Sequence, residues 1–303
     1  MRKTGLFLAS IVLSATLWAE LPEKKGLDVI NRANAEAYIG FLASDALEGR
    51  EAGFRGGRIA GEYIVSNLKT MGIEPLFESY YQPFEAYNKE RQKKGRFQVH
   101  PDSIAKLKQG VHQKLSMNNI LGKIEGKNPN EYVIIGAHFG FDPMLDGDRV
   151  YNGADDNASG VSAVLQVAKA FLATGVQPER TVIFAFWDGE EKGLLGSKYF
   201  VQTFLEMDKV KGYLNYDMIG RNKDESKPMH VVYFYTEAHP VFGDWLKNDI
   251  KKYGLNLTPD YRPWDKPVGG SDNASFALLD IPVIWYHTDG HPDYHMPSDH
   301  VEK

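Results

Sequence analysis

The 303-residue sequence predicts an α/β protein with a mixed, mostly parallel central sheet, helices on both faces and an added helical region at the N-terminus. From residue 119 onward, runs of β-branched and aromatic residues alternate with helical patterns, which is typical of a parallel sheet covered on both faces. Between residues 34 and 68, apolar residues recur at helical spacing on either side of a turn-rich segment at 47–57. Because the sequence contains no internal repeat and no low-complexity linker, a single domain spanning residues 20–303 is the simplest interpretation.

The predicted elements follow from these patterns in chain order. Two helices are expected between residues 34 and 68. Residues 77–118 show no clear period and include the charged run 89–96, so an irregular, solvated region with short strands is expected there. The strands predicted beyond it are residues 119–124, 131–137, 181–187, 212–217, 231–235 and 282–286, and the predicted helices are residues 158–171, 194–205, 239–253 and 273–279. In such sheets, functional groups gather at the carboxyl ends of the strands.

The composition excludes several classes of protein. With 43% hydrophobic and 25% charged residues, the chain resembles an ordinary soluble globular protein rather than a disordered or fibrous one. Its net charge of -5 and its lack of a long basic run argue against nucleic acid or an anionic membrane as the main partner. The absence of cysteine excludes disulfide bonds and thioether lipidation, so stability must come from the core unless a bound metal adds to it.

The N-terminal residues are typical of a secretory signal peptide. Arg2 and Lys3 precede an apolar stretch at residues 6–17, and the polar sequence begins at Glu20. An apolar stretch of about a dozen residues is shorter than the roughly 20 that span a bilayer, so no stable membrane anchor is expected. We therefore expect residues 1–19 to be removed on export and the mature protein to be periplasmic or secreted.

Five side chains suited to metal binding stand at turn-like breaks beside apolar runs. They are His138, Asp156, Glu191, Asp217 and His295. Imidazole suits zinc, and carboxylates bridge divalent ions and balance their charge. Each residue alone has a simpler role, such as a structural histidine or a helix cap at Asp156. The combination favours a metallohydrolase, although manganese and cobalt would suit the same ligands.

Glu190 and Glu191 are adjacent carboxylates that follow the strand predicted at residues 181–187. Paired acids at the start of a helix can stabilise its dipole. At a strand end they also permit a division of labour, in which one binds the metal and the other takes a proton from water. Asp217 closes another apolar strand, and a carboxylate in that position needs a partner.

Taken in order, these segments resemble the M28 family of zinc peptidases, most of which are aminopeptidases. The matching segments are residues 42–45, 49–50, 153–160, 190–197, 215–220 and 291–299. The resemblance therefore runs from about residue 42 to the end of the sequence. It implies the zinc-aminopeptidase type of α/β fold, similar to the phosphorylase/hydrolase-like class, and hydrolysis of N-terminal residues from peptides with a free N-terminus.

The resemblance also implies a ligand set for two zinc ions. Asp156 would bridge the ions, Glu191 and His295 would complete one site, and His138 and Asp217 would complete the other. The oligomeric state is left open.

The resemblance further implies catalytic roles for two residues. Glu190 would act as the general base that deprotonates a metal-bound water and passes the proton to the leaving amine. Tyr294, next to a ligand, would help to stabilise the oxyanion.

The sequence departs from the family at the first ligand. The family usually has His-x-Asp-His there, with the aspartate orienting the histidine, whereas this chain reads Ala-His-Phe-Gly-Phe-Asp-Pro at residues 137–143. Loss of such an orienting carboxylate typically costs about 10- to 100-fold in metal affinity or activity. Because of this departure, the number of bound zinc ions is left open, either one or two. Asp142 and Asp155 are candidates to replace the missing aspartate.

Two other functions remain as alternatives. A glutaminyl-cyclase-like acyltransferase would need a single zinc, for which Asp156, Glu191 and His295 suffice, and metal stoichiometry with cyclisation of an N-terminal glutamine would identify it. A metal-poor, peptidase-like binding module would bind no metal. The aromatic residues Trp264, Trp285 and Tyr286, together with the loop at residues 269–273, would either line an apolar pocket or belong to the core.

Overall fold

The computed structural model describes residues 21–89, 96–141 and 149–303. The predicted signal peptide, residues 1–19, lies outside these ranges. The strands are β1 (Glu74–Pro75), β2 (Tyr81–Lys89), β3 (His112–Ile124), β4 (Asn128–His138), β5 (Arg180–Trp187), β6 (Val210–Tyr216), β7 (His230–Thr236), β8 (Thr258–Trp264) and β9 (Val283–His287). The helices are α1 (Pro22–Asp28), α2 (Arg32–Leu42), α3 (Arg55–Met71), α4 (Pro101–Leu107), α5 (Gly160–Ala173), α6 (Leu195–Thr203), α7 (Val241–Tyr253) and α8 (Asn273–Ala277).

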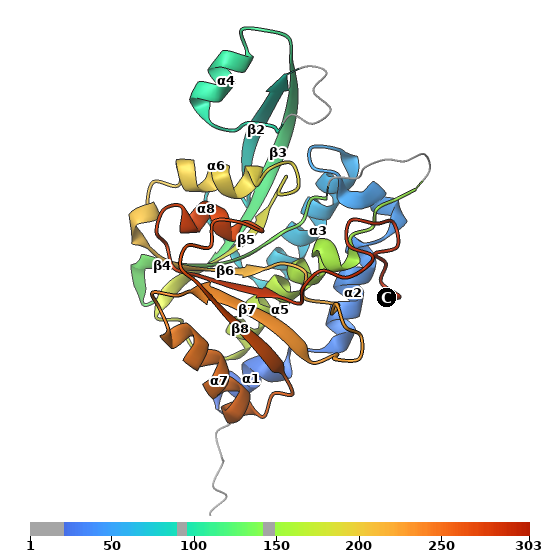
Figure 1. Cartoon of the computed structure of the whole chain (residues 1–303). Coiled ribbons are helices and arrows are strands. Elements are labelled where there is room, and N and C mark those ends of the chain that lie inside the picture. Colours follow the sequence, from blue (N-terminus) through green and yellow to red (C-terminus); the bar gives the residue numbers. More distant parts are fainter. Residues whose placement is uncertain (1–20, 90–95, 142–148) are drawn as a thin grey trace, which may run out of the picture.

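The strands of the described ranges form one mixed sheet in the order β1-β3-β5-β4-β6-β9-β7-β8, with β2 paired to β3 off this path (Figure 1). The central block β5-β4-β6-β9 is parallel, and antiparallel pairs border it on both sides. The predicted mixed α/β class is therefore confirmed, with the parallel part at the centre of the sheet. Among the described residues, no helix is both long and apolar enough to span a membrane.

The two faces of the sheet bury separate hydrophobic clusters, because successive side chains of a strand point to opposite faces. On β5, Val182, Phe184 and Phe186 belong to one cluster, whereas Ile183, Ala185 and Trp187 belong to the other. Helices α2, α3 and α5 cover the first face, and α6 and α8 cover the second (Figure 1). Each large apolar side chain buried in this way contributes roughly 1.5–3 kcal/mol. A strand buried on both faces must be apolar throughout, which is why the sequence pattern identified β5.

The region predicted to be irregular, residues 77–118, contains regular structure instead. Strand β2 pairs with β3 along its whole length, and β3 starts at His112 rather than at residue 119. This antiparallel pair and α4 form an arm that projects from the body of the protein (Figure 1). The prediction was wrong because the outer part of β3 carries mostly polar, partly exposed residues and has no apolar run. The charged run at residues 89–96 lies almost entirely outside the described residues.

A buried arginine joins the N-terminal region to the segments that carry the metal-binding candidates. The Arg50 side chain is 1% exposed, and within the described ranges all of its hydrogen bonds go to backbone carbonyls. Its Nε lies 2.9 Å from the Phe139 oxygen, Nη1 lies 2.6 Å from the Asn152 oxygen, and Nη2 lies 3.0 Å from the Gly153 oxygen. Nη1 also donates to the Leu42 oxygen. Burial lowers the pKa of Arg50 to about 10, so the guanidinium stays charged at neutral pH.

Replacement of Arg50 by leucine is expected to destabilise the fold by about 3–5 kcal/mol, since several buried carbonyl oxygens lose their donors together. Urea unfolding followed by circular dichroism measures this change. The matched control is Arg58→Leu, because Arg58 lies near the surface and donates a single 3.3 Å bond to the Gly53 oxygen. That control should change stability by no more than about 0.5 kcal/mol. Equal effects of the two substitutions would contradict the role assigned to Arg50.

Candidate metal centre

The candidate residues meet at the carboxyl edge of the parallel block. His138 is the last residue of β4, and Asp217 directly follows β6. Because β5, β4, β6 and β9 run in parallel, their ends bring together residues that are distant in sequence. The other candidates come from the loops after β5 and β9 and from the segment that precedes α5: Glu190, Glu191, His295 and Asp156.

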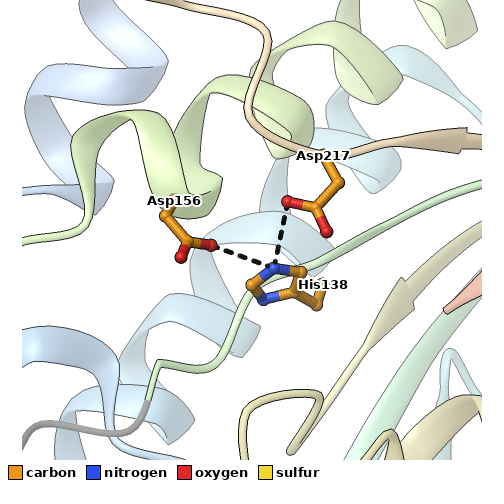
Figure 2. Close-up of side chains that lie close together, drawn as sticks. All are labelled: His138, Asp156 and Asp217. Atoms are coloured by element: carbon orange, nitrogen blue, oxygen red, sulfur yellow. Dashed lines mark ion pairs between the residues drawn. The ribbon is translucent and has the colours of Figure 1, made fainter. Parts of the chain in front are cut away.

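His138 lies between two carboxylates (Figure 2). Its Nε2 is 3.2 Å from Oδ1 of Asp156 and 3.5 Å from Oδ1 of Asp217. The side chains are almost completely buried, and one ligand atom from each lies within 4.8 Å of the others. One imidazole and two carboxylates at this separation form a suitable set of ligands for a divalent ion.

A second set of ligands shares Asp156 with the first. Nε2 of His295 lies 3.0 Å from Oδ2 of Asp156 and 3.2 Å from Oε1 of Glu191. These three groups also lie within 4.8 Å of one another. Asp156 therefore faces the two histidines with different oxygens, as a carboxylate that bridges two ions would.

Glu190 lies beside both sets, because its carboxylate is within 4.8 Å of His138 and Glu191. Burial raises the pKa of Glu190 well above its usual value, and the neighbouring carboxylates raise it further. Burial, followed by repulsion from Asp156, raises the pKa of Glu191 to about 7. Burial also raises the pKa of Asp156, but hydrogen bonds from His138 and His295 outweigh it and lower the pKa overall. This crowding of buried acids is unfavourable without a cation, so the donor set fits a metal centre.

A backbone carbonyl contacts His138 at the ring nitrogen that an orienting aspartate would otherwise bind. Nδ1 of His138 lies 3.3 Å from the Gly140 oxygen. A carbonyl can only accept a hydrogen bond, so Nδ1 donates to it and Nε2 is directed at the carboxylates. Gly140 permits the close packing that this needs, because a Cβ there would lie 2.9 Å from Oδ1 of Asp188.

Neither predicted substitute for that aspartate is seen to orient His138. Asp142 lies outside the described residues. Asp155 is occupied elsewhere: its Oδ1 accepts a 2.6 Å hydrogen bond from the Gly220 N–H, and its Oδ2 lies 3.1 Å from Nε2 of His291.

The simpler role considered for Asp156 was a helix cap, but Asn157 rather than Asp156 contacts the first N–H of α5. Oδ1 of Asn157 accepts a 2.9 Å hydrogen bond from the Gly160 N–H at the start of α5. The same oxygen accepts from the Met218 N–H at 3.2 Å, and Nδ2 donates to the Tyr216 oxygen at 2.9 Å. The Asp156 carboxylate is therefore free to face the two histidines.

A pocket of about 250 Å³ opens onto both sets of ligands. Trp285 forms part of its wall. Of the two roles considered for Trp285, pocket wall or core, the structure thus supports the pocket wall. The Trp285 ring packs closely on Gly270, where a Cβ would lie 2.6 Å from the indole. Tyr294 also lines the pocket, with its ring centroid 3.8 Å from that of His295. Burial, with the nearby carboxylates, raises the pKa of Tyr294.

Sequence reasoning missed three residues near the centre. His287 lines the pocket and holds its Nδ1 2.7 Å from the Asp217 oxygen. Asp272 is fully buried, and burial raises its pKa to about 7. Asp299 accepts hydrogen bonds from the backbone that carries Asp156. A signal existed for the last two, since Asp272 lies in a loop considered for the pocket and Asp299 ends a segment that matched the family.

The sequence model of peptidase family M28 matches residues 119–303, which is more than half of the chain. The leupeptin-inactivating enzyme 1 of Streptomyces exfoliatus is 35% identical over 169 residues, covering 54% of this chain and 34% of that protein. An aminopeptidase of Pseudomonas aeruginosa is 39% identical over 112 residues, covering 36% of this chain and 19% of that protein. The matched segments thus span about a third or less of these relatives.

Two of the solved structures that share the fold differ in activity. BSAP, a zinc aminopeptidase from Bacillus subtilis, aligns with a TM-score of 0.65 and 17% identity, covering 93% of this chain and 91% of that chain. The glutaminyl cyclase of Porphyromonas gingivalis aligns with a TM-score of 0.61 and 17% identity, covering 91% of this chain and 92% of that chain. At this level of identity, the similarity establishes the architecture alone.

Proposed function

Because this chain belongs to peptidase family M28, we propose that it is an exported aminopeptidase that uses two zinc ions to remove N-terminal residues from peptides. The proposed active unit is a single domain formed by residues 20–303. Export is inferred from the charged and apolar pattern of residues 1–19.

The shared position of Asp156 is the observation that carries this proposal. Its two oxygens face different histidines at 3.2 and 3.0 Å, and each histidine has a further carboxylate partner. One ion would be held by Asp156, His138 and Asp217, and the other by Asp156, His295 and Glu191. With Glu190, the centre contains four carboxylates, whose formal charge equals that of two divalent ions.

Bound zinc would supply a Lewis acid for the scissile carbonyl and would lower the pKa of the attacking water. The protein provides the proton transfers. Glu190 accepts the proton of the water as the new carbon–oxygen bond forms, and it then donates that proton to the leaving amine as the carbon–nitrogen bond breaks. Tyr294 is proposed to stabilise the oxyanion through its hydroxyl, which the raised pKa keeps protonated at neutral pH.

The small pocket supports removal of terminal rather than internal residues. Its volume of about 250 Å³ suits one amino-acid side chain rather than a length of peptide. Trp285 and Met218 give its wall an apolar part, while Glu190 and Glu191 place negative charge beside it. A substrate with a free, positively charged N-terminus complements these surroundings.

A glutaminyl-cyclase-like acyltransferase is the second candidate. The fold is shared with the Porphyromonas gingivalis enzyme, and the set Asp156, Glu191 and His295 would hold one zinc without the His138 side of the centre. The aminopeptidase is favoured because His138 and Asp217 remain in a geometry suited to a second ion. The same retention of ligands argues against a metal-poor binding module.

Removal of metal should abolish hydrolysis of a leucine-terminated chromogenic amide, and added zinc should restore it. The purified protein should contain about two zinc ions per chain by elemental mass spectrometry, since its two sets of ligands share one carboxylate. One ion together with cyclisation of an N-terminal glutamine would identify the acyltransferase instead. No bound ion after zinc is supplied would leave only the binding module.

A further inference from the structure

Asp299, in the segment that follows β9, lies against the backbone that carries the central carboxylate. Its Oδ1 accepts a hydrogen bond from the Asp155 N–H at 3.0 Å, and its Oδ2 accepts from the Asp156 N–H at 3.1 Å. The Ala154 N–H donates to the Asp299 backbone oxygen at 3.2 Å. Asp299 is 4% exposed, so these bonds form away from solvent. Asp299 thus accepts hydrogen bonds from three successive backbone N–H groups, those of residues 154–156. The last of them belongs to Asp156, the proposed bridging ligand.

The Asp155 side chain ties the same backbone to two other loops. Oδ1 of Asp155 accepts from the Gly220 N–H at 2.6 Å, and Gly220 lies in the loop that begins with Asp217. Oδ2 of Asp155 lies 3.1 Å from Nε2 of the buried His291, which precedes His295 in the loop after β9. The pairing with Asp155 raises the pKa of His291, as expected for an imidazole beside a carboxylate.

We propose that Asp299 is a positioning residue of the metal centre. Its carboxylate fixes the orientation of the backbone from which Asp156 reaches both sets of ligands. The Asp155 backbone is bound by the same carboxylate. Through its contacts with Gly220 and His291, the Asp155 side chain fixes the positions of the loops that carry Asp217 and His295 relative to that backbone. Asp299 is not among the residues that line the pocket at the centre, and it acts through Asp155 and Asp156. The inference rests on the metal centre of the proposed function.

The physical reason lies in the number of acceptors that Asp299 supplies. Both oxygens of the Asp299 carboxylate accept from the Asp155 N–H, and Oδ2 also accepts from the Asp156 N–H. Asparagine would turn an NH₂ donor toward one of these N–H groups, and alanine would offer no side-chain acceptor. The displaced N–H groups would be buried without partners unless the segment moved. Any such movement carries Asp156 with it, and a shift of a shared ligand weakens both ion sites at once.

The test measures zinc binding rather than turnover. Metal-free wild type, Asp299→Asn and Asp299→Ala are each titrated with zinc in competition with a chromophoric chelator, and circular dichroism verifies that each variant is folded. Both variants should bind zinc with a dissociation constant raised about 10- to 100-fold, the usual effect of removing a group that orients ligands.

Thr181→Val is the matched control for the loss of a buried side-chain acceptor. Oγ1 of Thr181 accepts a 3.1 Å hydrogen bond from the Gly126 N–H at the opposite end of β5. This variant should lose stability without a change in zinc affinity. Zinc affinity unchanged in both folded Asp299 variants, or lowered equally in Thr181→Val, would overturn the positioning role alone. A wild type that binds no zinc would overturn the proposed function and this inference together.

Discussion

Replacement of Glu190 by glutamine is expected to lower kcat about 10²- to 10⁴-fold while both zinc ions stay bound, because glutamine keeps the size of the side chain but cannot accept the proton of the attacking water. Glu190 lies beside His138 and Glu191 but does not belong to either set that contains Asp156. KM should change little, since the substitution affects proton transfer more than substrate binding. Steady-state kinetics on a leucine-terminated amide and elemental analysis of the same sample give the two readouts.

Glu179→Gln is the control for this experiment, because Glu179 is a well-exposed carboxylate paired with Lys127. It should leave kcat and zinc content unchanged. A Glu190→Gln variant with near wild-type kcat would exclude Glu190 as the base. A variant that loses zinc along with activity would instead make Glu190 a ligand, and the division of labour between the adjacent glutamates would be wrong.

Replacement of Asp156 by alanine is expected to reduce the zinc content from about two ions per chain to none at moderate zinc concentration. Asp156 belongs both to the set with His138 and Asp217 and to the set with His295 and Glu191, so its loss leaves each of these sets with one imidazole and one carboxylate. Hydrolysis should fall to background at the same time. Zinc content by elemental mass spectrometry after gel filtration is the measurement.

The variant His295→Ala is the control that shows whether Asp156 bridges two ions. Loss of a ligand from one set alone should remove one ion, whereas loss of a bridging ligand should remove both. His295 contacts Asp156 and Glu191 but does not belong to the set that includes His138. This variant should retain about one ion, held by the unaltered set. If Asp156→Ala also retains one ion, Asp156 is a ligand of a single site, and the centre is not bridged.

The clustering of the candidate ligands was predictable because each candidate stands at a recognisable position in the sequence. His138 and Asp217 end apolar strands, and the central strands were identified by runs such as residues 181–187. Once those strands are parallel neighbours, their ends must lie together. The structure brings all the predicted ligands and Glu190 into one cluster.

The contacts that orient those ligands could not be predicted, since they depend on distances between segments. The sequence showed that His138 lacks an orienting aspartate, but not that the Gly140 carbonyl lies 3.3 Å from Nδ1. It gave no sign that Asp155 and Asp156 are bound by Asp299, more than 140 residues further along the chain. The long β3 was missed for another reason, because an arm with solvated faces needs no apolar run.

The segment Asp155–Asp156–Asn157 has a consequence for how this protein can change during evolution. Its three consecutive side chains contact different partners. Asp155 pairs with His291, and Asp156 faces the histidines of the centre. Asn157 accepts from the first N–H of α5 and donates to the Tyr216 oxygen. Most loops accept insertions and deletions readily. Here, the gain or loss of a single codon would misdirect all three side chains together. We therefore expect this stretch to keep its length across lineages even where individual residues around it vary.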